Sequence, residues 1–118
     1  MSIPPLTLYG LKNCDTCRKA LAALTTAGHD VAFVDIRAEA DLPARVPAWL
    51  KAVGAEKLVN RRSTTWRGLT TAQQAGALGD GAAALLIANP ALIKRPVIDT
   101  GADILVGWDK GTEQALKA

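Results

Sequence analysis

The spacing of apolar residues predicts a β-α-β unit in the first part of the chain. Residues 6–9 (LTLY) form a short apolar run that ends at a glycine and is typical of a strand. Residues 15–27 carry apolar positions at helical spacing, and Gly28 follows where helices commonly end. The predicted buried face of this helix consists of Cys17, Ala20, Leu21 and Leu24. Residues 31–34 (VAFV) are continuously apolar, which predicts a buried strand joined to the first by a right-handed crossover.

The middle of the chain predicts helices joined by polar segments. Asp41 is placed to cap a helix that ends at Gly54, and we expect Pro47 to kink it or delay its start. Its predicted buried face is Val46, Trp49, Leu50 and Val53. Residues 60–67 are polar and irregular, which indicates a loop. Two further helices are predicted, one from Thr70 or Thr71 and one from Asp80 to about residue 89.

The last part of the chain predicts a hairpin and a final helix. Residues 97–99 (VID) and 103–106 (DILV) flank a turn, and Asp109 is placed to cap the helix that follows. The order β-α-β, helices, β-β-α predicts an α/β fold: a thioredoxin-like mixed sheet with a helical insertion after the second strand. We therefore predict one domain over residues 1–118, with a core of about residues 5–37 and 90–118 and an insertion of about residues 40–89.

Composition and charge narrow the possible partners. The chain has 118 residues, of which 49% are hydrophobic, and a net charge of +3. This excess is too small to predict direct nucleic-acid binding, which requires many phosphate contacts, but it suits a small anionic substrate. Residues 1–6 carry no targeting signal and no segment has the apolar length of a membrane span, so we expect a cytoplasmic protein with no membrane partner. Because the domain is small and compact, we also expect a monomer. Cytosolic thiols are kept reduced, which argues against a permanent structural disulfide.

Candidate chemistry lies in the CxxC motif of residues 14–17 (CDTC). Cys14 is predicted at the N-terminus of the first helix, where the helix dipole and unpaired backbone N–H groups favour negative charge. Lys12 and Arg18 add positive charge, so we expect a lowered pKa for the Cys14 thiol. Cys17 follows one helical turn later on the apolar face, which suits a sheltered thiol that resolves a mixed disulfide on Cys14.

Two other interpretations of the cysteines are open. A CxxC can form half of a zinc site, but the chain has no second CxxC and His29 is its only histidine, so no metal site is predicted. The cysteines could instead be inert core residues. The strand–CxxC–helix context favours redox chemistry.

Three blocks of sequence, in order, resemble the arsenate-reductase-like family (ArsC/Spx/YffB). They are residues 8–20 (LYGLKNCDTCRKA), 58–67 (LVNRRSTTWR) and 89–97 (NPALIKRPV). The resemblance implies a thioredoxin-like fold with a helical insertion and Cys14 as the nucleophile. It also implies that Arg95 faces the active site and that the Arg95–Pro96 peptide bond is cis.

Subgroups of this family differ in function. Those that reduce arsenate place three arginines around the cysteine, at positions that here hold Asn60, Arg95 and Trp108, which puts arsenate reduction in doubt. Spx-type regulators carry a CxxC switch and bind RNA polymerase. The segment at residues 60–67 is closest to the YffB-like subgroup, which resembles glutathione-dependent thiol reductases. That subgroup usually has a single cysteine in the motif that corresponds to residues 14–17, so Cys17 is an addition to its pattern.

These observations predict a thiol-disulfide oxidoreductase that uses glutathione as co-substrate and holds no tightly bound cofactor. The predicted catalytic residues are Cys14, Cys17 and Arg95. The predicted substrate-binding residues are Lys12, Asn13, Thr16, Arg62, Thr64, Thr65, Trp66 and Pro96. Arg62 and Arg95 could pair with the two carboxylates of glutathione, although the basic segment is also compatible with a solvated loop. Alternative functions are an Spx-like regulator with RNA polymerase as partner, and an arsenate reductase with glutathione or glutaredoxin as donor.

Overall fold

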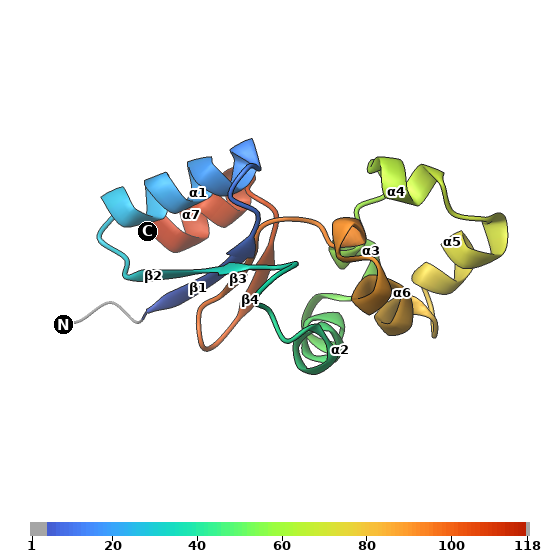
Figure 1. Ribbon diagram of the computed structural model, residues 1–118. Coiled ribbons are helices and arrows are strands. Elements are labelled where there is room, and N and C mark those ends of the chain that lie inside the picture. The colour runs from blue at the N-terminus through green and yellow to red at the C-terminus, as the bar shows by residue number, and fades with distance from the viewer. Residues whose placement is uncertain (1–4, 118) are drawn as a thin grey trace. The chain divides into compact units, whose positions relative to one another are not determined.

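The computed structural model describes residues 5–117, so residues 1–4 and 118 of the predicted domain lie outside the described part (Figure 1). By its internal contacts the chain divides into two compact units. The first contains the chain up to Ala40 and from Arg95 onward, and the second is Asp41–Lys94.

The first unit is built on a mixed four-stranded sheet in the order β2-β1-β3-β4. Strands β1 (Leu6–Gly10) and β2 (Val31–Asp35) are parallel and connected by α1 (Asp15–Thr26). Strands β3 (Val97–Asp99) and β4 (Ile104–Val106) form the antiparallel hairpin, and β3 also pairs with β1. Helix α7 (Lys110–Lys117) packs against α1, and both lie on the same face of the sheet (Figure 1). The predicted thioredoxin-like sheet is confirmed.

The core of the first unit forms where one face of α1 meets the sheet. Its buried residues are Leu6, Leu8, Cys17, Ala20, Leu24, Ile98 and Leu116. The prediction of β2 as a buried strand is wrong, because Ala32 is exposed and Phe33 and its other neighbours are only half-buried. Strand β2 lies at the edge of the sheet and, within the described residues, pairs with β1 alone, so its surroundings cover it incompletely.

The second unit is helical, as predicted. Its elements are α2 (Leu42–Val53), α3 (Ala55–Leu58), α4 (Thr64–Arg67), α5 (Thr71–Ala77), α6 (Ala82–Ala88) and the 3₁₀ turn η1 (Pro90–Leu92). Asp41 caps α2 as expected, but Pro47 neither delays nor ends the helix, which begins at Leu42. The cap of α6 is Gly81 rather than Asp80.

The segment at residues 60–67 is not entirely a loop, because it contains the single turn α4. The Ser63 hydroxyl oxygen accepts a hydrogen bond from the Trp66 backbone N–H at 3.1 Å and so caps this turn. Trp49 is 1% exposed and belongs to the buried interior, as the spacing predicted. A β-bridge between Val59 and Ile93 joins the segment that follows α3 to the segment that follows η1.

Candidate functional site

Cys14 stands at the junction of β1 and α1, where it is the N-cap residue of the helix. Its backbone is extended, with φ −92° and ψ 118°, while the first helical hydrogen bonds already form around it. Its N–H donates to the Leu11 carbonyl at 3.1 Å, and its carbonyl accepts from the Arg18 N–H at 3.0 Å. This geometry holds a half-buried thiol at the positive end of the helix dipole.

The surroundings of Cys14 favour its thiolate form. Burial is the largest single effect and raises the pKa of the Cys14 thiol, but it is opposed by hydrogen bonds from the Cys17 backbone N–H and the Cys17 side chain. The Arg95 guanidinium contributes a further hydrogen bond and a favourable charge, and the net result is a lowered pKa for Cys14. A thiolate at the start of a helix beside an arginine is the reactive form of cysteine.

Cys17 has the opposite character. It is fully buried, and desolvation is the main reason that its pKa rises to about 11. Its thiol therefore remains protonated at neutral pH while Cys14 ionises more readily. The structure thus makes the two cysteines unequal: Cys14 is half-buried with a lowered pKa, and Cys17 is fully buried with a raised pKa.

Gly10, the last residue of β1, provides the space for the Cys17 side chain. A Cβ placed on Gly10 would lie 2.6 Å from the Cys17 sulfur and 3.2 Å from the Cys17 Cβ. A separation of 2.6 Å is shorter than van der Waals contact allows, so the missing side chain of Gly10 is a condition for Cys17 to sit where it does. The sequence shows a glycine at the end of a strand but not which side chain fills the space above it.

The positive charges expected to act on Cys14 differ from those that the structure provides. Arg18 forms an ion pair with Asp15 on the exposed surface of α1. Lys12 is exposed and helps to lower the pKa of Asp35, after the larger effect of the Ala38 and Arg37 N–H groups. The cation that acts on the Cys14 sulfur is Arg95, which lies 81 residues later in the sequence.

Arg95 immediately precedes β3, and its peptide bond with Pro96 is cis, as the resemblance implied. Pro96 is fully buried, and its carbonyl accepts a hydrogen bond from the Gly107 N–H at 2.8 Å. The Nε atom of Arg95 is buried and has no hydrogen-bond partner among residues 5–117. Asn13 and Thr16, the other predicted binding residues of this unit, are exposed.

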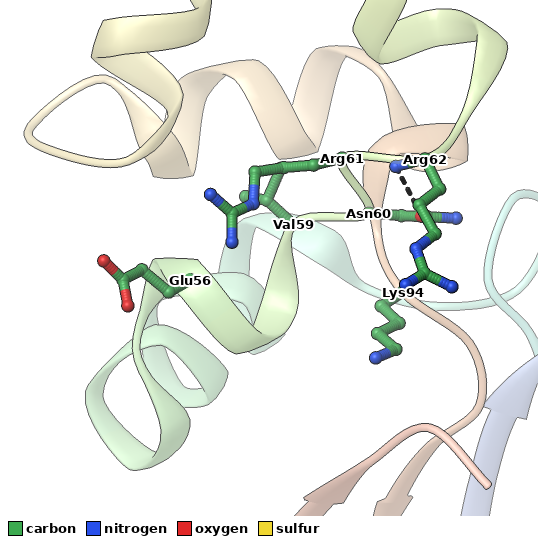
Figure 2. A pocket seen from close by; sticks show the side chains of 6 residues that line it. All are labelled: Glu56, Val59, Asn60, Arg61, Arg62 and Lys94. Atoms are coloured by element: carbon green, nitrogen blue, oxygen red, sulfur yellow. Dashed lines mark hydrogen bonds between the residues drawn. The ribbon is translucent and has the colours of Figure 1, made fainter. Parts of the chain in front are cut away.

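The remaining predicted binding residues belong to the second unit. Arg62 and Thr64 are exposed, whereas Thr65 and Trp66 are half-buried in α4. Of these four residues, only Arg62 lines a pocket of about 350 Å³. The other residues of the pocket, shown in Figure 2, are Glu56, Val59, Asn60, Arg61 and Lys94. Sequence reasoning did not predict these five as a group, because the proximity of Lys94 to the others depends on the Val59–Ile93 bridge.

The described residues contain no group of three or more metal-binding side chains. His29 has a structural contact, since its Nε2 lies 2.5 Å from the Leu116 carbonyl oxygen of α7. In residues 5–117 no helix combines the length and apolar character needed to cross a membrane.

Comparisons with known proteins agree with the geometry. The family model described as the ArsC family matches residues 9–116. An uncharacterised protein of Haemophilus influenzae is 38% identical over 114 residues, which cover 96% of this chain and 99% of the relative. The solved structure of a YffB protein is 34% identical with a TM-score of 0.85, over 96% of this chain and 99% of the other. An arsenate reductase (ArsC) related protein from Brucella melitensis is 35% identical with a TM-score of 0.75, over 94% of this chain and 92% of the other.

Proposed function

Because the chain belongs to the ArsC family, a family of thiol-based oxidoreductases, we propose that it is a glutathione-dependent thiol-disulfide oxidoreductase with Cys14 as nucleophile. One observation carries the proposal: two cysteines one helical turn apart have pKa values shifted in opposite directions. Pairs of titratable groups with separated pKa values mark the division of chemical roles.

The proposed reaction begins with the Cys14 thiolate attacking the glutathione sulfur of a mixed disulfide. A new sulfur–sulfur bond forms between Cys14 and glutathione, the old one breaks, and the substrate leaves as a thiolate that takes a proton from solvent. The substrate is reduced by two electrons and Cys14 is oxidised to a mixed disulfide. Arg95 stabilises the Cys14 thiolate before attack.

Two routes then return the protein to its reduced state. In one, the thiolate of a second glutathione attacks the glutathione sulfur bound to Cys14, which releases glutathione disulfide and the Cys14 thiolate. In the other, Cys17 loses its proton to solvent and attacks the Cys14 sulfur, which releases glutathione thiolate and forms the Cys14–Cys17 disulfide. Two further glutathione molecules then reduce this disulfide. The raised pKa of Cys17 makes its attack the slower event at neutral pH.

In the first unit, residues that flank Cys14 or follow Arg95 in sequence are proposed to position the substrate. Lys12, Asn13 and Thr16 flank the nucleophile in sequence, and the buried cis-Pro96 follows Arg95. Arg62, Thr64, Thr65 and Trp66 of the second unit are proposed to bind the anionic and apolar parts of glutathione.

Turnover of a model glutathione mixed disulfide with glutathione as reductant tests the proposed activity. We expect Cys14→Ser to abolish turnover and Cys17→Ser to retain it through the route that uses a second glutathione. Equal rates for the wild type and Cys14→Ser would contradict the proposal.

Arsenate reduction is a second activity to test, because an arsenate reductase related protein is 35% identical to this chain. Asn60 and Trp108 stand where the resemblance places two of the three arsenate-binding arginines, and Asn60 instead uses its Oδ1 to accept the Arg62 N–H at 3.1 Å. We therefore expect no arsenate-dependent consumption of glutathione. A rate of consumption that rises with arsenate concentration would contradict this expectation.

A further inference from the structure

We propose that the pocket of the second unit binds a small dianion, a molecule with two carboxylates or a phosphate group, mainly between Arg62 and Lys94. This site does not depend on the proposed reaction at Cys14. Its lining includes three cationic side chains and one carboxylate, so its net charge is +2.

The positive charges of the pocket are not neutralised within the protein. In the part of the chain that the structure describes, neither Arg61, Arg62 nor Lys94 forms an ion pair, whereas Arg18 does so with Asp15. With three cations and one carboxylate around the cavity, the net positive charge produces a local potential that attracts anions. An arginine can bind a carboxylate or phosphate through two parallel hydrogen bonds, and a lysine adds a mobile point charge.

The backbone that carries these side chains is held in place. The Asn60 N–H donates to the Leu92 carbonyl at 2.7 Å, and the Lys94 N–H donates to the Leu58 carbonyl at 2.8 Å. These bonds flank the bridge between the buried residues Val59 and Ile93, so backbone hydrogen bonds hold together the segments that bear Arg62 and Lys94. Pre-organised cations lose less conformational entropy on binding than cations on a free loop do.

The side chains divide the pocket into two ends, as Figure 2 shows. Arg61 extends toward Glu56, so its charge is partly offset there, whereas Arg62 turns past Asn60 toward Lys94. The Asn60 Oδ1 atom accepts a hydrogen bond from the backbone N–H of Arg62. The Asn60 Nδ2 group therefore remains as a neutral donor beside the Arg62 guanidinium. The end formed by Arg62, Lys94 and Asn60 is therefore the end that suits an anion.

The size of the pocket indicates the class of ligand. A cavity of about 350 Å³ lies at the lower end of the range for small-molecule sites. It suits a compact dianion rather than nucleic acid, whose phosphates require a longer basic surface. Glutathione, with two carboxylates, is one source of this chemistry and free phosphate is another.

Titration calorimetry on the full-length Cys14→Ser protein tests the site without thiol chemistry. The ligands are glutarate, inorganic phosphate and S-methylglutathione, with the neutral glutaramide as control. We expect saturable binding of at least one dianion and none of glutaramide. The tighter of glutarate and phosphate identifies the anionic group preferred, and binding of S-methylglutathione with the same variant dependence identifies glutathione as a source.

Variants connect the binding to the pocket. Arg62→Gln and Lys94→Gln should each raise the dissociation constant about tenfold, since each removes one charge-assisted hydrogen bond. Lys51→Gln is the matched control, because Lys51 is an exposed cation of the same unit outside the pocket, and it should leave binding unchanged. The proposal is overturned if no dianion binds at concentrations up to about 10 mM, or if Lys51→Gln weakens binding as much as the pocket variants. Turnover by the wild type is measured separately, so loss of this site and failure of the Cys14 reaction are distinguishable.

Discussion

Replacing Gly10 with alanine is expected to destabilise the protein through one contact, the one with Cys17. The added methyl group would meet the Cys17 sulfur at 2.6 Å, the Cys17 Cβ at 3.2 Å and Leu8 Cδ2 at 3.3 Å. Gly10, Cys17 and Leu8 are all buried, so the strand or helix α1 must move to relieve the overlap. Forcing extra volume into a packed core costs about 1–3 kcal/mol, and we expect the Gly10→Ala variant to lose about 2 kcal/mol of its free energy of unfolding. Gly10 does not have a positive φ, so backbone strain adds nothing to this expectation.

A double-mutant cycle separates the Cys17 contact from the rest. In a Cys17→Ala background the sulfur is absent and only the two contacts above 3 Å remain, so the cost of Gly10→Ala should fall to about 1 kcal/mol or less. Gly76→Ala in α5 is the matched control, because nothing lies within 4 Å of its Cβ position. That change should stabilise the protein by about 0.5 kcal/mol through helix propensity.

The assay is chemical denaturation of the four reduced proteins of the cycle and the control. If Gly10→Ala costs the same in both backgrounds, the sulfur is not what limits the space. If it costs less than about 0.5 kcal/mol in the wild type, which is the range of a neutral surface change, the account of the site is wrong.

Three further predictions follow from the same geometry. The rate of Cys14 alkylation should rise with pH, with a midpoint below the pKa of a free thiol. Arg95→Gln should move this midpoint to higher pH, and Arg95→Lys should give an intermediate midpoint. Identical pH–rate profiles for the wild type and both variants would exclude a role for Arg95. The free energy of unfolding should fall as pH rises from about 9 to 11, because the pKa of the Cys17 thiol is about 9.0 in the unfolded chain and about 11 in the folded protein. Chemical denaturation at each pH measures this loss, and the contribution from Cys17 should be absent from Cys17→Ala. Asp109→Ala should lower the free energy of unfolding by about 1 kcal/mol, since Asp109 Oδ1 accepts the Thr112 N–H at 2.8 Å and caps α7; an unchanged denaturation midpoint would show that this cap does not contribute.

Local sequence signals predicted most of the elements. The helix of residues 15–27 is observed as Asp15–Thr26, and the hairpin strand at residues 97–99 has the predicted bounds. Both rest on periodicity and on residues that end an element, which are properties of a few neighbouring positions. The exposure of β2 was not predictable in this way, because it depends on which strand lies at the edge of the sheet.

The candidate site was predicted in part for the same reason. The difference in burial between the two cysteines follows from helical spacing, which places Cys17 on the buried face. The identity of the cation next to Cys14 does not follow from local spacing. Arg18 forms an ion pair with Asp15, and Arg95, the cation that lowers the pKa of Cys14, is 81 residues away in sequence. The family resemblance predicted that Arg95 faces the active site, whereas composition and periodicity alone give no indication of it. The pocket around Arg62 and Lys94 likewise depends on a long-range bridge that leaves no local pattern.

The most direct test of the central claim is to find which sulfur accepts glutathione in a single turnover. The reduced wild type, Cys14→Ser and Cys17→Ser are each mixed with a model glutathione mixed disulfide at neutral pH, quenched with acid and analysed by mass spectrometry. The account predicts a glutathione adduct on Cys14 that accumulates in Cys17→Ser, that converts in part to the intramolecular disulfide in the wild type, and that is absent from Cys14→Ser. An adduct on Cys17 in Cys14→Ser, formed as fast as the adduct on Cys14 in Cys17→Ser, would contradict the assignment of Cys14 as the nucleophile.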